Sequence, residues 1–252
     1  MIDMAGGIIS KLKYLDPFTY VDILLDKIKP RAQRNKYLDW LIYLAFAAIF
    51  AYALLFIFGL ILGTSAPGVI VLSGSMEPSF YRGDIIILQG ADAENIKGQD
   101  VYFPGISTLK GKMLKEVAEV DYENQKIIFA NGTEVKINKE GDVIVYNSQY
   151  YPEPIIHRVL AKVHVADGTY FITKGDNPKT NWFVDQACGN VVFGYIPGTD
   201  LITITSIESA CITPYVPNEK ELEGKMIGKI PFLGWVKLIP FDEIPKLLGL
   251  KK

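Results

Sequence analysis

A long apolar run near the N-terminus constrains the fold of this chain more than any other feature. Residues 41–62 are 22 amino acids without one charged side chain, and a helix of that length measures about 33 Å, enough to cross a bilayer core of about 30 Å. A buried core helix would keep a polar face, and a cleavable signal peptide has a shorter apolar part nearer the N-terminus. We therefore expect a transmembrane helix within residues 37–63 that remains as an anchor.

The charges beside this helix predict its orientation. Five basic residues lie between Lys27 and Lys36, whereas residues 63–80 carry none. Because basic flanks stay on the cytoplasmic side, residues 1–36 should be cytoplasmic and residues 64–252 extracytoplasmic. Apolar residues at helical spacing over residues 18–28 predict a short amphipathic helix on the inner leaflet.

The composition of the extracytoplasmic part excludes one class of partner. Residues 64–252 carry 19 basic and 23 acidic side chains, with no basic stripe. A phosphate backbone needs such a stripe, so nucleic acid is not expected as a partner. A segment of this length normally forms one domain with a sizeable core.

Beyond the anchor the pattern changes from helical to alternating. Segments rich in Val, Ile, Tyr and Phe predict strands, and Asn131-Gly132 between residues 126–130 and 133–138 predicts a hairpin whose two turn residues both adopt positive φ. No amphipathic helices alternate with these segments, so we expect a mainly β domain of antiparallel sheets packed or curled together. The other expected strands are residues 84–89, 142–147, 155–165, 169–174, 190–195 and 201–207.

Ser75 is the candidate nucleophile. It lies in the sequence SGSMEP at residues 73–78, directly after the apolar residues 69–72. Gly74 and Pro78 predict a sharp turn that exposes the serine hydroxyl and nearby backbone N–H groups. A serine hydroxyl attacks only when a base takes its proton, so a base is needed from elsewhere in the chain.

The chain has two histidines, His157 and His164, both in the strand expected over residues 155–165. Seven residues apart on a regular strand, they point to opposite faces unless a bulge intervenes. His157 shares an apolar face that continues through Val159 and Val163, whereas the face of His164 is basic. Histidine has a pKa near 6.5 and needs almost no shift to accept a proton at neutral pH. His157 is therefore the candidate base.

Six blocks of sequence run in order through nearly the whole extracytoplasmic domain. They are SGSMEP at residues 73–78, RGD at 82–84, GDVIVY at 141–146, PIIHRV at 154–159, TKGDN at 173–177 and GKIPFLGWV at 228–236. Together they resemble the ordered signature of type I signal peptidases, in the branch of archaea and the endoplasmic reticulum, and this order behind a transmembrane helix makes the resemblance specific.

The resemblance implies a membrane-bound serine endopeptidase that removes signal peptides from exported preproteins at the cell membrane or the endoplasmic-reticulum membrane. It makes Ser75 the nucleophile, His157 the base where the bacterial branch has a lysine, and Ser73 with the Ser75 N–H the oxyanion donors. Asp176 and Asp185 would be the acidic residues, one orienting the histidine and the other supporting the site. Asp185 lies three residues further along than the family pattern expects, which favours Asp176. The implied partners are preproteins, the lipid bilayer, and a translocon or other signal peptidase subunits.

Two alternatives stay open. Residues 112–117 faintly resemble the lysine block of the bacterial branch, which would make Lys115 the base. That role requires a pKa lowered by about three units from about 10.4, and the polar neighbours of Lys115 do not favour the necessary burial. The chain could instead be a catalytically silent membrane subunit that binds preproteins, although it retains both the serine and the histidine.

The remaining signals concern the cysteines and the C-terminus. Cys188 and Cys211 both lie on the expected oxidising side of the membrane, where a disulfide is permitted. Cysteines and histidines scattered singly lack the spacing of a metal site, and no metal or cofactor is expected. The sequon at Asn131 is a candidate glycosylation site. Residues 232–250 are too short for a second span and form either an interfacial segment or a final strand with a tail.

Overall fold

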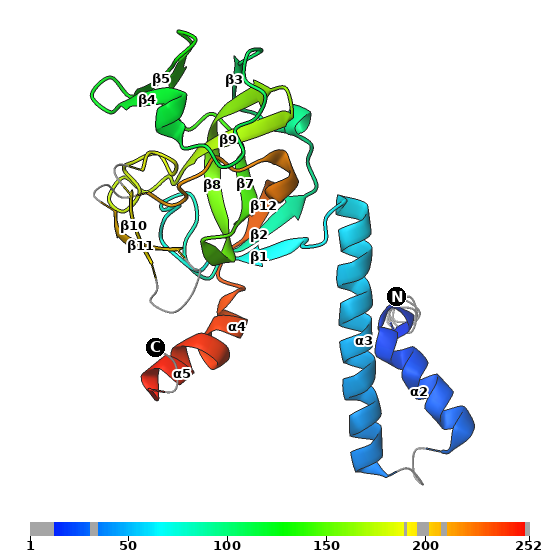
Figure 1. Cartoon of the computed structure of the whole chain (residues 1–252). Coiled ribbons are helices and arrows are strands. Elements are labelled where there is room, and N and C mark those ends of the chain that lie inside the picture. The colour runs from blue at the N-terminus through cyan, green and yellow to red at the C-terminus, as the bar shows by residue number, and fades with distance from the viewer. Residues whose placement is uncertain (1–12, 31–34, 189–190, 196–201, 208–210, 250–252) are drawn as a thin grey trace, which may run out of the picture. The chain divides into compact units, whose positions relative to one another are not determined.

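The computed structural model describes residues 13–30, 35–188, 191–195, 202–207 and 211–249 (Figure 1). The chain forms two compact units, Met1–Phe58 and Gly59–Lys252. The first is helical, and the second is built mainly from strands. Parts of the sequence expectations, namely Arg31 and Arg34 of the basic flank and the strand ends at Asn190 and Leu201, lie outside the described residues.

The first unit contains a 3-10 turn (Lys13–Leu15), α2 (Pro17–Ile28) and most of α3 (Lys36–Leu62), whose last turn belongs to the second unit. α2 begins where the sequence allows it, because the Asp16 carboxylate accepts a hydrogen bond from the Phe18 N–H at 3.0 Å and satisfies a free backbone donor. The Phe18 ring then packs edge-on against the Phe46 ring of α3, with 5.4 Å between ring centroids. The helix expected over residues 18–28 is thus present, and it lies against α3.

α3 is long and apolar enough to cross a membrane, and it is the one such helix in the part of the chain that the structure describes. It has no buried residue within the structure and no polar face. A helix that is apolar all round needs an apolar solvent, which a bilayer core supplies. The expectation of one apolar N-terminal helix that could span a membrane is confirmed.

The second unit is built on a seven-stranded sheet, and the expectation of a mainly antiparallel β fold is confirmed. One pairing differs, because β3 (Gln99–Tyr102) runs parallel to β8 (Tyr151–Val165) while the other pairs in this sheet are antiparallel. β9 (Gly168–Lys174) pairs with β8 beside the main path. The order along that path is β1 (Gly68–Ile70), β2 (Ile85–Gln89), β12 (Leu222–Ile230), β7 (Val143–Ser148), β8 (Tyr151–Val165) and β3 (Gln99–Tyr102).

Two smaller sheets are added to this one. The first contains β4 (Ala118–Asp121), β5 (Lys126–Phe129) and β6 (Glu134–Lys136), and the second pairs β10 (Val191–Tyr195) with β11 (Ile202–Ile207). Among the described residues, β10 and β11 have only each other as sheet partners.

The turn between β5 and β6 differs in one respect from its prediction. β5 and β6 do pair as a hairpin around Asn131 and Gly132, but Gly132 alone has positive φ, at 84°. Asn131 instead uses its side chain: Oδ1 accepts from the Thr133 N–H at 3.0 Å, and Nδ2 donates to the Tyr102 carbonyl at 2.9 Å. An Asx-type turn has replaced the expected two-residue turn.

The expected face of β8 is interrupted by a bulge. The register to β9 shifts between Val159 and Ala161, so one residue is inserted and the side-chain alternation changes there. Val159 packs in the cluster of Ile144 and Phe171, whereas Ala161 packs in a separate cluster toward β4–β6. The apolar face predicted to run from His157 through Val163 is therefore split between two parts of the core.

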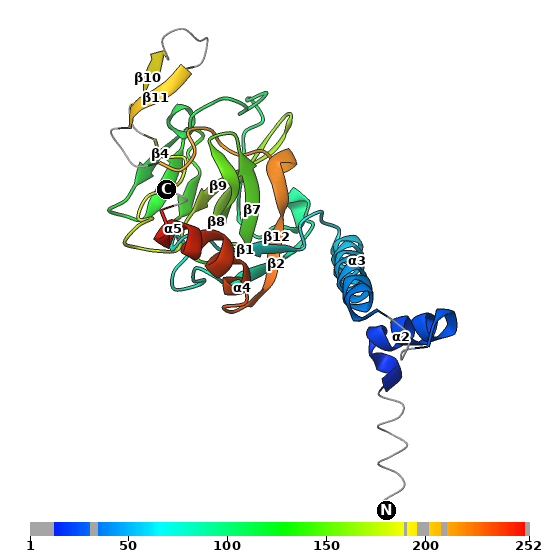
Figure 2. The ribbon, with the colours of Figure 1, turned by 90° about the horizontal axis from the view of Figure 1, so that it is seen from below.

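The chain leaves the sheet after β12 as a short helical arm. It consists of α4 (Trp235–Leu238), a π-helical turn (Ile239–Glu243) and α5 (Ile244–Leu247). This arm projects below the sheet in Figure 1 and lies in front of it in Figure 2, which is seen from below. Residues 235–247 are therefore helical, which the alternative of a final strand did not predict.

Candidate active site

Ser75 lies in a turn that follows β1 and is held by two buried side chains. Met76 and Phe80 are 1% and 3% exposed and pack in the core with residues of β2 and β7. The Phe80 N–H donates to the Met76 carbonyl at 3.0 Å, which closes the turn. Ser75 is half-buried and Ser73 is exposed. Apolar burial thus fixes a turn whose hydroxyl groups remain accessible.

The same turn rests on the segment that follows β9. The Asn177 N–H donates to the Ser75 carbonyl at 2.9 Å, and Asn177 Nδ2 donates to the Gly74 carbonyl at 2.8 Å. Gly175 allows this approach, because a Cβ atom there would lie 2.7 Å from the Ser75 carbonyl oxygen. The SGSMEP and TKGDN blocks are therefore in direct contact.

The groups expected to stabilise an oxyanion lie side by side. The Ser73 hydroxyl donates to Ser75 Oγ at 3.2 Å. Within the described residues, the Ser75 N–H has no acceptor. An unoccupied backbone donor beside a hydroxyl donor is what a developing oxyanion requires.

His157 is paired with Asp185 in the interior. Its Nδ1 lies 2.5 Å from Asp185 Oδ2, and the two side chains are 3% and 0% exposed. A carboxylate beside Nδ1 favours the tautomer that carries its proton there, which leaves Nε2 with a lone pair. Nε2 has no hydrogen-bond partner among the described residues. This is the arrangement of a general base whose orientation is fixed by an acid.

Further polar side chains hold Asp185 in place. Thr173 Oγ1 donates to Asp185 Oδ2 at 2.7 Å and is itself within 3.1 Å of the Tyr146 hydroxyl. Gln186 Nε2 donates to Thr173 Oγ1 at 3.0 Å. Burial raises the pKa of Tyr146 well above its usual value, so Tyr146 stays a neutral hydrogen-bonding group. Asp185 Oδ1 is buried and has no partner among the described residues.

Asp176 has a different role in the geometry. The Arg158 guanidinium donates to both of its oxygens, at 2.8 and 2.7 Å, and the Ser79 hydroxyl donates to Oδ2 at 2.5 Å. Burial alone would raise the pKa of Asp176, but the hydrogen bonds from Arg158 and Ser79 outweigh it and lower the pKa below its ordinary value. Asp176 therefore joins β8 to the end of the Ser75 turn, through its ion pair with Arg158 and its hydrogen bond from Ser79.

Strand alternation explains why Asp185 and Asp176 lie on opposite faces of the sheet. His157 and Arg158 are neighbours on β8, so their side chains leave opposite faces of the sheet. Asp185 meets the histidine on one face, and Asp176 meets the arginine on the other. The sequence left open which of the two acids orients the histidine, and in this structure Asp185 is the one that contacts the imidazole.

The expected nucleophile, Ser75, and the expected base, His157, are not joined directly. No hydrogen bond links Ser75 Oγ to the His157 ring in the described part of the chain. The two residues are linked indirectly through the backbone. β8, which contains His157, pairs with β9 up to Lys174, and the segment just after Lys174 hydrogen-bonds to the Ser75 turn. Catalytic hydrogen bonds are often long without substrate and tighten when it binds.

The other candidate bases lie elsewhere. Lys115 is exposed on a 3-10 turn (Leu114–Glu116). His164 is bound at the β3 edge, where its Nε2 lies 2.7 Å from Asp100 Oδ1 and its ring stacks on Tyr102 with 4.6 Å between centroids. Within the described part of the chain, neither side chain forms a hydrogen bond or ion pair with Ser75.

A disulfide closes the chain three residues after the histidine's acid. Cys188 and Cys211 are bonded, with 4.9 Å between their Cα atoms. The backbone N–H groups of Ile212 and Thr213 then donate to the Asp185 carbonyl at 2.8 and 3.1 Å. The bond thus joins the two ends of the excursion that contains β10 and β11, close to Asp185.

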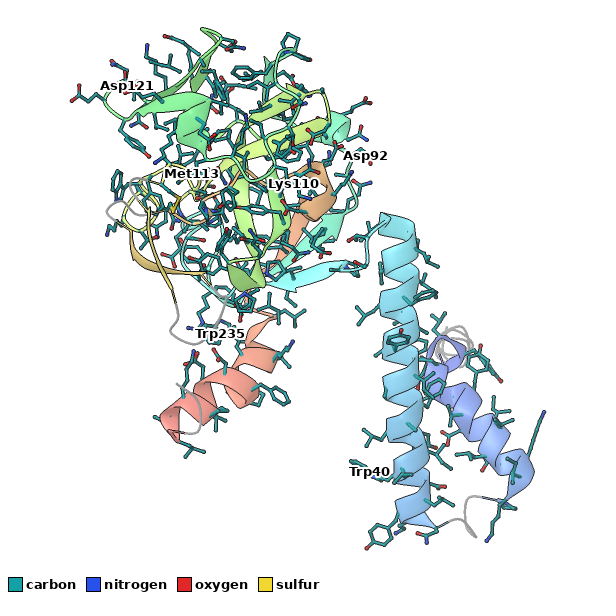
Figure 3. The ribbon with its side chains drawn as sticks, viewed as in Figure 1. Trp40, Asp92, Lys110, Met113, Asp121 and Trp235 are labelled. Atoms are coloured by element: carbon teal, nitrogen blue, oxygen red, sulfur yellow. A yellow bond between two sulfur atoms is a disulfide. The ribbon has the colours of Figure 1, made fainter. Side chains whose placement is uncertain are left out.

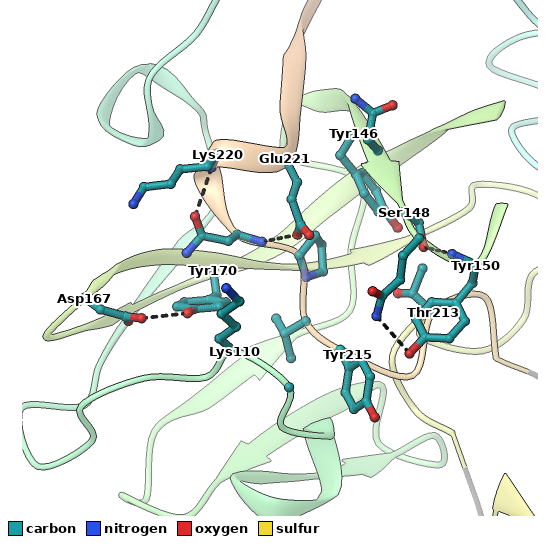
Figure 4. Close-up of a pocket in the computed structure, with 16 residues that line it drawn as sticks. Lys110, Tyr146, Ser148, Tyr150, Asp167, Tyr170, Thr213, Tyr215, Lys220 and Glu221 are labelled. Atoms are coloured by element: carbon teal, nitrogen blue, oxygen red, sulfur yellow. Dashed lines mark hydrogen bonds between the residues drawn. The ribbon is translucent and has the colours of Figure 1, made fainter. Parts of the chain in front are cut away.

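A separate cavity borders this network. It measures about 510 Å³ and lies between β7, β9 and residues 213–221 (Figure 4). Its lining includes Tyr146, Tyr150, Tyr170 and Tyr215, but neither Ser75 nor His157. The cavity is therefore distinct from the candidate active site, although Tyr146 belongs to both surroundings.

Sequence reasoning missed three residues that the geometry singles out, Thr173, Arg158 and Ser79. Each lies in, or next to, a block that was already identified. The available signal was strand parity, because adjacent residues on one strand need partners on different faces. Applied to His157 and Arg158, that rule calls for two separate acids.

Comparison with curated proteins finds relatives among fungal signal peptidase subunits. The signal peptidase complex catalytic subunit sec11 of Schizosaccharomyces pombe is 35% identical over 150 residues, which cover 55% of this chain and 66% of that protein. The SEC11 subunit of Scheffersomyces stipitis is 29% identical over 64% of this chain and 84% of its own length. That of Yarrowia lipolytica is 30% identical over 78% of this chain and 77% of its own length.

The family of this chain is inferred from these relatives. No protein-family model matches the chain. The three relatives are fungal, so they support the endoplasmic-reticulum side of the expected resemblance and not the archaeal one. The extent of the matches shows that the chain belongs to the signal peptidase complex catalytic subunits, type I signal peptidases of the endoplasmic-reticulum branch.

Proposed function

We propose that this chain is a membrane-bound serine endopeptidase that cleaves signal peptides, with Ser75 as nucleophile and His157 as general base. The observation that carries the assignment is the buried hydrogen bond between His157 Nδ1 and Asp185, which leaves Nε2 available. Membership of the signal peptidase family supplies the reaction class.

The reaction then follows from the groups present. Ser75 Oγ attacks the scissile carbonyl carbon while its proton passes to His157 Nε2, and the resulting imidazolium is stabilised by Asp185. The Ser75 N–H and the Ser73 hydroxyl donate to the oxyanion. Collapse of the tetrahedral intermediate breaks the peptide bond as Nε2 returns the proton to the leaving amine. A water molecule, deprotonated by the same nitrogen, hydrolyses the acyl-serine and releases the signal peptide.

The anchor restricts which substrates can reach the serine. Ser75 is only the thirteenth residue after Leu62, and a fully extended chain of that length reaches about 43 Å. With an N-terminus in the cytoplasm, Ser75 would work on preproteins that are themselves inserted in the bilayer. The relatives are named as subunits of a complex, and we propose that this chain also works beside other subunits or a translocon.

Two alternatives are a serine–lysine protease and a catalytically silent subunit. A serine–lysine mechanism would use Lys115, but that side chain is exposed and lacks the burial that makes lysine a base near neutral pH. A catalytically silent subunit would bind preproteins without cutting them. The polar groups arranged around His157 and Asp185 favour an enzyme over a silent subunit.

The experiment compares three variants of the full chain in detergent or vesicles, with a preprotein that has a small residue before the cleavage site. Ser75→Ala and His157→Ala should each lower the cleavage rate by about 10³-fold or more, whereas Lys115→Ala should cleave at the wild-type rate. Cleavage by Ser75→Ala at the wild-type rate would overturn the enzyme assignment. Loss of cleavage in Lys115→Ala alone would move the base from His157 to Lys115.

A further inference from the structure

Trp182 is an exposed side chain in a buried segment that leads to the histidine's acid. It is 54% exposed, whereas Asn181, Phe183, Val184 and Asp185 are each 6% exposed or less. Leaving an indole in water costs free energy that a polar side chain at this position would avoid. Tryptophan is also enriched among the residues that bind another polypeptide chain. Trp182 is therefore a candidate for contact with a substrate.

Two aromatic rings hold the indole in place. The Trp182 ring packs edge-on against the rings of Tyr122 and Phe183, with centroids at 5.4 and 5.5 Å. The Tyr122 hydroxyl in turn accepts a hydrogen bond from the Val184 N–H at 3.2 Å. A side chain whose position is already fixed loses less conformational entropy when it binds a partner.

The support for Trp182 comes from the small sheet of β4, β5 and β6. Tyr122 is the first residue after β4 and begins the turn toward β5. Phe129 of β5 and Val135 of β6 are buried in the same hydrophobic cluster as Val184. The small sheet and the segment that carries Trp182 therefore form one packed region.

The segment that carries Trp182 also supports the nucleophile. Lys174 Nζ donates to the carbonyl groups of Gly175 and Asn181, at 2.9 and 2.6 Å. A Cβ atom at Gly175 would lie 2.7 Å from the Ser75 carbonyl oxygen and 2.7 Å from Asn181 Cβ, so these two atoms are close neighbours. Because Trp182 directly follows Asn181, the indole lies at the rim of the candidate active site.

The path of a preprotein indicates which part of it Trp182 would meet. The Gly90 N–H donates to the Leu62 carbonyl at 2.8 Å, so the end of α3 is attached beside β1 and β2. β4 and β5 lie at the opposite end of the second unit (Figure 1), and Figure 3 marks Asp121, the last residue of β4, far from Trp235. A membrane-inserted preprotein would thus approach from the side of β1 and β2 and leave Ser75 toward β4 and β5.

We propose that Trp182 is a specificity-determining residue that contacts the mature part of the preprotein just after the scissile bond and favours apolar side chains there. The inference rests on the proposed function, because it names a further substrate contact of the same site. The indole offers an apolar surface, and an apolar substrate residue that covers it leaves water. This contact also gives a role to the small sheet, whose turn holds Tyr122 against the indole.

The first experiment measures kcat/KM for preproteins that carry Leu or Ser at each of the first four positions after the cut in turn. The wild type should prefer Leu by about fivefold at one or more of these positions. Trp182→Ala should lower this ratio to about one, mainly through a higher KM for the Leu substrates. Its rate with the Ser substrates and its melting temperature should stay the same, and Trp182→Phe should keep part of the preference.

Tyr102→Ala is the matched control and should keep the wild-type ratio. Tyr102 is also an exposed aromatic residue, at 64%, and stacks on a neighbouring ring at the β3 edge. An unchanged ratio in Trp182→Ala overturns the inference and leaves the proposed function standing. Absence of any Leu preference in the wild type overturns the inference as well.

The second experiment does not depend on cleavage. Cys188 and Cys211 are the chain's cysteines and are bonded to each other, so Trp182→Cys introduces a single free thiol. Combined with Ser75→Ala, which keeps the substrate uncut, it is oxidised together with preproteins that carry one cysteine at successive positions on both sides of the cut. Disulfide-linked product is expected for positions just after the cut, and Tyr102→Cys in the same background should give none. Linkage only to positions before the cut, or to none, overturns the inference.

Discussion

His157 and Arg158 are adjacent on one strand, yet the two surroundings they build differ in almost every respect. Arg158 meets Asp176 in a bidentate ion pair in which both carboxylate oxygens are used. His157 meets Asp185 through one oxygen and leaves the other buried without a partner among the described residues. Asp176 is thus fully occupied as an ion-pair partner, whereas Asp185 holds the imidazole in the tautomer whose Nε2 can accept a proton.

The difference predicts that the roles of the two acids, Asp176 in the TKGDN block and Asp185 nine residues later, are separable by experiment. Asp185 should determine the rate of cleavage with little influence on folding. Asp176 should determine the stability of the Ser75 turn, and the rate only through it.

Replacing Asp185 tests the catalytic side and should have the largest effect. Asp185→Asn keeps the size of the side chain but removes the charge that fixes the histidine tautomer and stabilises the imidazolium. We expect kcat to fall by about 10⁴-fold, with a melting temperature in detergent close to that of the wild type. Asp176→Asn is the matched control. If it loses as much activity as Asp185→Asn while remaining folded, the two acids are not separable.

Replacing Asp176 by an apolar residue tests the structural side. Asp176→Leu leaves the Arg158 guanidinium without its partner, and breaking a buried pair in this way costs about 3 kcal/mol of unfolding free energy. Thermal unfolding in detergent measures the loss. The double variant Arg158→Met with Asp176→Leu should recover most of it, because no unpaired charge remains. A double variant as unstable as the single one would contradict an ion-pair origin.

Two hydroxyl groups sharpen the comparison at a smaller scale, since each donates to one of the acids. Thr173→Val removes the donor to Asp185 and should lower kcat about tenfold, which corresponds to about 1.4 kcal/mol. Ser79→Ala removes the donor to Asp176 and should lower stability by about 1 kcal/mol. Initial cleavage rates and melting temperatures are measured for both variants. If Thr173→Val lost only stability and Ser79→Ala lost only kcat, the catalytic role of Asp185 and the structural role of Asp176 would be rejected.

Acid should affect the structural pair in a defined range. The pKa of Asp176 is lowered in the folded state from an ordinary 3.8, so its stabilising contribution is complete above 3.8 and is lost as pH falls through the folded value. The difference in melting temperature between wild type and Asp176→Leu should be constant near neutral pH and shrink below about pH 3.8. A difference that stays constant to about pH 2.5 would contradict the lowered pKa.

Much of the fold could be predicted because the pattern is local. β7, β8 and β9 are rich in branched and aromatic residues, and the expected bounds fall within a few residues of the observed ones. The apolar helix was defined by length and hydropathy alone. Such features need no knowledge of which segments come together in space.

β12 shows what a local pattern does not contain. It lies between β2 and β7 in the sheet, yet glycines interrupt its sequence and its register shifts against both neighbours. Gly224 has φ of 155°, and a Cβ atom there would lie 2.5 Å from the Gln89 carbonyl oxygen. The glycine is needed for close strand packing, but in the sequence it weakens the strand signal.

The candidate site was predictable in its residue types and less so in its pairing. Ser75 and His157 follow from the blocks that contain them, but the partner of the histidine depends on which face each side chain leaves. Spacing along the chain made Asp176 the safer site residue and left open which acid orients the histidine, whereas the sheet brings Asp185 to the ring. Spacing in sequence does not show which of two acids faces a given side of a sheet.

The disulfide gives the region after Asp185 an unusual independence. The disulfide between Cys188 and Cys211 closes the residues between them into a covalent loop. A change within this loop is therefore resisted by the covalent bond before it can displace Asp185. The length and sequence of the loop can therefore change during evolution, or be exchanged by an engineer, while the carboxylate beside the imidazole keeps its position.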